Sequence, residues 1–115
     1  MSEPRSRVTT HVLDATSGRP AVGVAVTLAH QVDGQWQPVA DGVTDDDGRV
    51  GRFGPVDLEP GVYRVGFATG DYFAGLGQAG FYPSVEIAFT LTDADAHYHV
   101  PLLLSPFAYS TYRGS

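Results

Sequence analysis

The chain of 115 residues contains no cysteine, no lysine and no asparagine, and all seven of its basic residues are arginine. Without a thiol, disulfides, thiolate zinc sites and cysteine nucleophiles are excluded. Without lysine, Schiff-base chemistry and the lysine of a phosphate-binding loop are excluded as well. The candidates left for chemistry are the four histidines, the seven arginines and the hydroxyl side chains.

Positive charge and long apolar runs are also scarce. The seven arginines face 13 acidic residues, and the net charge of -6 repels both a phosphate backbone and an anionic membrane surface. The densest apolar run, residues 100–104, is far shorter than the roughly 20 residues of a membrane span. The first seven residues carry charges of both signs and no apolar stretch. We therefore expect a cytoplasmic protein that binds neither nucleic acid nor membrane.

The composition favours an all-β fold. Fourteen valines, nine threonines, six tyrosines and six phenylalanines suit half-buried, pleated strands. Apolar residues alternate with others over 22–28, 62–67 and 85–91, between segments rich in glycine, proline and aspartate. This pattern predicts a sandwich of seven to eight short strands. We expect one domain over residues 8–115, preceded by a flexible segment at residues 1–7.

One stretch, residues 69–77, breaks the alternation and is expected to form a short helix capped by Asp71. Two other patterns have ordinary explanations. The G-x-G-x-x-G spacing of residues 75–80 is followed directly by a predicted strand, so it does not indicate a dinucleotide site. The aspartates of 45–48 lack the closing glutamate of a calcium loop, and they predict a hairpin turn that ends beside Arg49.

The histidines are the most informative residues. Because side chains alternate along a strand, His97 and His99 should point to one face and Tyr98 to the other. His11 lies in another strand-like run, residues 8–14. Histidines in strands are usually structural, but these three also fit general acid–base chemistry or three ligands of a zinc ion. Spacing alone does not choose among these alternatives.

The last nine residues are rich in aromatic and hydroxyl side chains, whereas chain ends usually fray. They predict a docked strand with tyrosine and arginine of the kind found at subunit interfaces.

Six segments together resemble the 5-hydroxyisourate hydrolases, also called transthyretin-like proteins, over nearly the whole chain. This resemblance implies a two-sheet antiparallel β-sandwich with one short helix. It also implies a homotetramer whose active sites lie where dimers meet. The segments are residues 9–14, 18–21, 44–49, 70–73, 81–83, and 97–105 running into 109–115, which ends in Tyr-Arg-Gly-Ser.

The resemblance assigns roles to individual residues. It implies catalytic roles for His11, Arg49 and His99 and a substrate contact for Tyr112, with Thr111 and Ser115 in the same terminal motif. The reaction that it implies needs no metal and no cofactor, and the implied substrate is the small molecule 5-hydroxyisourate. Residues 107–108 are Phe-Ala where the family more usually has Tyr-Gly. The alternative function is a non-catalytic, transthyretin-like ligand-binding sandwich, since hormone-transport proteins share the fold.

Overall fold

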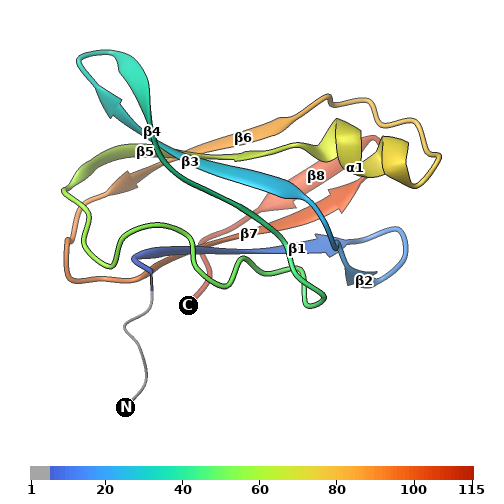
Figure 1. The fold of residues 1–115 in the computed structure, drawn as a ribbon, viewed down its shortest axis with the longest axis horizontal. Coiled ribbons are helices and arrows are strands. Elements are labelled where there is room, and N and C mark those ends of the chain that lie inside the picture. Colours follow the sequence, from blue (N-terminus) through green and yellow to red (C-terminus); the bar gives the residue numbers. More distant parts are fainter. Residues whose placement is uncertain (1–5) are drawn as a thin grey trace.

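The computed structural model describes residues 6–115, which form two four-stranded sheets packed face to face and one short helix (Figure 1). The all-β sandwich predicted from the alternation is confirmed. The elements are β1 (Val8–Asp14), β2 (Arg19–Pro20), β3 (Ala25–Val32), β4 (Gln35–Val43), β5 (Gly61–Phe67), α1 (Thr69–Gly75), β6 (Val85–Leu91), β7 (Tyr98–Ser105) and β8 (Ala108–Thr111).

The first sheet has the strand order β2-β1-β7-β8 and the second has the order β4-β3-β5-β6. All neighbouring strands are antiparallel except β1 and β7, which are parallel. The expected antiparallel sandwich is therefore confirmed at every strand pair except this one. Because the whole second sheet comes between β1 and β7 in the chain, no hairpin fixes their relative direction.

The core lies between the sheets and is built by the alternation seen in the sequence. In β1, Val8, Thr10, Val12 and Asp14 are buried and the residues between them are half-exposed. The aromatic rings Tyr63, Phe67, Phe53 and Phe73 are among the largest fully buried side chains. The same alternation turns Thr9 and His11 to the outer face of the first sheet.

Two predicted boundaries were wrong. Residues 22–24 alternate but precede β3, because Gly23 has a φ of 82° and its N–H donates to the Thr44 carbonyl, which bends the chain. The helix starts at Thr69, and Ala68 is its N-cap without a side-chain hydrogen bond, so Asp71 lies in the first turn and is not the cap. Burial of Thr69 and Phe73, one helical turn apart, positions this helix instead.

The predicted flexible segment, residues 1–7, falls mostly on residues 1–5, which lie outside the described residues. The remaining two residues are part of the domain. Ser6 is buried, and its hydroxyl donates to the Gly54 carbonyl and accepts the Phe53 N–H. Arg7 donates its N–H to the Pro55 carbonyl. Within residues 6–115, no helix has the length and apolar character needed to cross a membrane.

Candidate active site

The candidate site lies on the outer face of the first sheet, where β1 and β7 run side by side. The register pairs Thr9 with His99 and His11 with Pro101. Arg49 lies in the loop after β4 and reaches β1 through an isolated antiparallel bridge to His11. The fold thus brings together the three residues predicted to be catalytic, although they are separated by 38 and 50 positions in the chain.

A tight turn at residues 45–48 delivers Arg49. The Asp45 carboxylate accepts the N–H groups of Asp47 (2.9 Å) and Arg49 (3.0 Å), and these bonds lower the pKa of Asp45. Gly48 has a φ of 75°, and a Cβ there would clash with the Val12 carbonyl. Its own carbonyl accepts the Val12 N–H at 2.8 Å, which ties the turn to β1.

The predicted hairpin turn forms, because the Asp45 N–H donates to the Arg49 carbonyl at 2.8 Å. The residues after it do not extend the pairing along β4 but cross to the first sheet. The Arg49 side chain is exposed, and its guanidinium has no hydrogen-bonded or ion-paired partner within the described residues 6–115. Its planar set of donors is available to a ligand with oxygen acceptors.

His97 and His99 share one face, as predicted, because both approach Thr9 while Tyr98 between them is buried. The Thr9 Oγ1 lies 2.8 Å from His97 Nε2 and 2.8 Å from His99 Nδ1. The sequence reasoning did not single out Thr9. Its place two residues before His11, on the same face of the strand, was the available signal.

The electrostatic surroundings of His99 favour its neutral form. Burial lowers the pKa of His99 below the usual value of 6.5, and the charges of Arg49, His97 and His11 lower it further. A neutral imidazole at neutral pH can accept a proton from water. His99 therefore has the protonation state of a general base.

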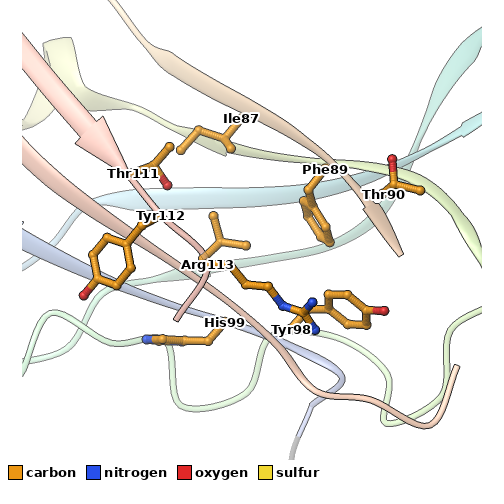
Figure 2. A pocket seen from close by; sticks show the side chains of 9 residues that line it. Ile87, Phe89, Thr90, Tyr98, His99, Thr111, Tyr112 and Arg113 are labelled. Carbon is orange, nitrogen blue, oxygen red and sulfur yellow. The ribbon is translucent and has the colours of Figure 1, made fainter. Parts of the chain in front are cut away.

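The C-terminal segment completes one wall. After β8 pairs with β7, the Gly114 N–H donates to the His99 carbonyl at 2.9 Å. A Cβ on Gly114 would lie 2.5 Å from His99 Cδ2, so glycine allows the backbone to pack against the imidazole. Arg113 turns the other way, and Figure 2 shows its guanidinium over the Tyr98 ring, 4.6 Å from the ring centre. These contacts bring Ser115 to the site.

Two cavities lie on either side of this segment. The first, of about 270 Å³, is lined by Thr9, Arg49, His97, His99 and Ser115, among others. We call it the histidine cavity. The second, of about 250 Å³, lies between the edge strands β6 and β8, and its lining is mostly apolar. We call it the edge cavity, and Figure 2 shows its lining side chains.

The two cavities divide the predicted site residues except His11, which lines neither of them. His99 lines both, while Thr111 and Tyr112 line the edge cavity and not the histidine cavity. The Thr111 hydroxyl donates to the Pro101 carbonyl at 2.7 Å, and Tyr112 is 59% exposed. Within one chain, these two side chains therefore do not meet Arg49 and Ser115.

The zinc alternative depends on three histidines converging. Among the described residues, no group of three or more histidine, aspartate or glutamate side chains is placed to hold a metal ion. Instead, His97 and His99 converge on a threonine hydroxyl. The Thr9 hydroxyl can donate to one of these imidazoles and accept from the other.

Comparisons with known proteins identify the family of the chain. The model of the HIUase/Transthyretin family matches residues 8–114. A 5-hydroxyisourate hydrolase of Mus musculus is 44% identical over 118 residues, covering 100% of both chains. The structure of Klebsiella pneumoniae 5-hydroxyisourate hydrolase has a TM-score of 0.84 and 35% identity, covering 94% of this chain and 97% of that one. Transthyretin from Sparus aurata has a TM-score of 0.90 and 35% identity, covering 96% and 97%. The chain belongs to the HIUase/Transthyretin family.

Proposed function

We propose that this chain hydrolyses 5-hydroxyisourate to 2-oxo-4-hydroxy-4-carboxy-5-ureidoimidazoline in urate degradation. Its similarity to curated hydrolases of that name supports the activity. Because transthyretin shares the fold equally well, fold alone does not separate enzyme from binding protein. The observation that carries the proposal is that the Arg49 guanidinium, which has no ion-paired partner among residues 6–115, and the His99 imidazole, whose pKa is lowered by burial, line one cavity.

The reaction needs an activated water and a stabilised oxyanion. In our proposal, His99 takes a proton from water as the water oxygen attacks the carbonyl carbon of the cyclic amide. Such assistance is typically worth about 10²–10⁴-fold in rate. Arg49 donates to the oxygen on which negative charge develops. The carbon–nitrogen bond of the ring then breaks, and the leaving nitrogen takes a proton from His99 or from His11.

Substrate binding involves the C-terminal motif in this proposal. Ser115 lines the histidine cavity directly. In this proposal Thr111 and Tyr112 reach the substrate from another copy of the chain, because within one chain they line the edge cavity and not the histidine cavity. The proposed scheme uses no metal and no cofactor, since two imidazoles and a guanidinium supply proton transfer and charge stabilisation.

We propose a homotetramer with active sites at the contact between dimers. Two features support self-association. The strands β6 and β8 are edges of their sheets, with backbone groups open to another strand, and an apolar cavity opens between them. Large hydrophobic side chains around this region are exposed, including Phe81 (68%) and Phe107 (69%). Sedimentation velocity should give four times the chain mass of 12.2 kDa, whereas a monomer would contradict the proposal.

The activity is tested with freshly generated 5-hydroxyisourate, whose decay is followed by ultraviolet absorbance. Purified protein should accelerate the decay in proportion to its concentration. The binding-protein alternative predicts no acceleration and measurable affinity for a ring ligand, so the same sample, examined by calorimetry, separates the two functions. The cytoplasmic location expected from the sequence stays a prediction.

A further inference from the structure

The Thr9 hydroxyl lies between two imidazoles that approach it through different ring atoms. His97 presents Nε2 and His99 presents Nδ1, each 2.8 Å from Thr9 Oγ1. Distances of this length are full hydrogen bonds for a hydroxyl. His97 precedes β7 and His99 belongs to it, so one side chain of β1 holds both histidines of the neighbouring segment.

A hydroxyl has only one proton, which couples the two rings. If Thr9 donates to one imidazole nitrogen, the other ring must donate its own N–H to the Thr9 oxygen. Donation to His97 Nε2 leaves the His97 proton on Nδ1 and requires a proton on His99 Nδ1. Donation to His99 Nδ1 leaves the His99 proton on Nε2 and requires a proton on His97 Nε2. Whenever the Thr9 proton lies in one of these two hydrogen bonds, the two neutral histidines therefore share one tautomer. Only a hydroxyl that accepted from both rings would leave them in opposite tautomers.

We infer that Thr9 is a positioning residue that links His97 to His99 and holds both rings in the Nδ1–H tautomer. This inference rests on the proposed function, because that tautomer leaves the Nε2 lone pair of His99 free to take the proton of water. The opposite tautomer would place a proton on the nitrogen that has to act as a base. His97 thus contributes to the proposed reaction through Thr9, without contact with the substrate.

The surroundings of His99 make its tautomer decisive for the proposed reaction. The ring is held on one edge by Thr9 and packs on the Gly114 backbone near Cδ2. The charged or titratable groups that act on it are Arg49, His97 and His11, and all three disfavour an imidazolium. Since His99 is held neutral, the choice between its two neutral tautomers decides whether Nε2 can act as a base.

Nuclear magnetic resonance tests the coupling without substrate. The full chain is labelled with ¹⁵N-histidine and examined by long-range ¹⁵N–¹H correlation at about pH 8.5, roughly two units above the reference histidine pKa. We expect Nδ1–H signals for both His97 and His99, assigned with His97→Asn and His11→Asn variants. Opposite tautomers in the two rings would overturn the coupling, and Nε2–H in both would overturn the assigned tautomer.

Variants of Thr9 test the consequence for the reaction. Thr9→Val keeps the shape but removes the hydroxyl, so kcat should fall about tenfold or more with little change in KM, a loss within the range of acid–base assistance. Thr9→Ser should retain most of the wild-type kcat, and the His99 tautomer signal should become mixed only in the valine variant. An unchanged kcat in Thr9→Val would overturn the inference.

The matched control is Thr69→Val, at the start of α1, which lines neither cavity. Thr69 is buried and its hydroxyl donates to the Tyr82 carbonyl at 3.3 Å, so this variant also loses one threonine hydrogen bond. It should melt at a lower temperature but keep the histidine tautomers and kcat. If the wild type did not hydrolyse 5-hydroxyisourate, the proposed function would fail while the tautomer measurement still stood.

Discussion

Replacing His99 by asparagine is expected to lower kcat for 5-hydroxyisourate hydrolysis by about 10²- to 10⁴-fold, the usual contribution of a positioned acid–base group. In the wild type, Thr9 Oγ1 lies 2.8 Å from His99 Nδ1. The asparagine amide can still reach this hydroxyl, but it cannot take a proton from water. The side chain is half-buried, so its replacement should cost little stability. Initial rates at saturating substrate, with thermal melting of the same samples, measure both effects.

The control for His99→Asn is His30→Asn. His30 lies on β3 in the other sheet, where its ring stacks on Tyr63 with the ring centres 4.3 Å apart. Losing that stacking should lower the melting temperature without changing kcat. If His99→Asn kept a rate within a few-fold of the wild type, the base would have to be another group, and His11 would be the next candidate.

The local part of the fold follows from the sequence because strand alternation is a local pattern. The run at residues 85–91 coincides with β6, and the run at residues 8–14 coincides with β1. The alternation at residues 22–24 misled because Gly23 has a positive φ, so the chain bends where the apolar pattern continues. A side-chain pattern does not report the backbone angle of one glycine.

The site depends more on contacts between distant segments. Alternation predicts that His97 and His99 share a face, but only the parallel register of β1 and β7 brings Thr9 to them. The bridge between His11 and Arg49 likewise depends on a loop that crosses from one sheet to the other. No spacing rule gives such pairings, and the family resemblance identified these residues without explaining how they meet. It also did not indicate that Tyr112 lies in a separate cavity within one chain.

The second large effect is expected for Arg49. Arg49→Gln removes the charge that would stabilise the oxyanion, and loss of such a donor typically lowers kcat by about 10²- to 10³-fold. It also removes one cause of the lowered pKa of His99. The pKa of His99 should rise toward 6.5, so the acidic limb of the pH–rate profile should move to higher pH. Rates measured from about pH 5 to pH 9 give both quantities.

Arg49→Lys separates charge from geometry. Lysine keeps the positive charge near His99, so the acidic limb should stay at its wild-type pH, but it lacks the planar pair of donors and kcat should still fall. Arg19→Gln, an exposed arginine on β2, is the matched control and should change neither quantity. If Arg49→Gln lowered kcat but left the acidic limb in place, the titrating base would not be His99. Burial and the charges of His97 and His11 also lower the pKa of His99. In Arg49→Gln the acidic limb of the pH–rate profile should therefore still lie below pH 6.5.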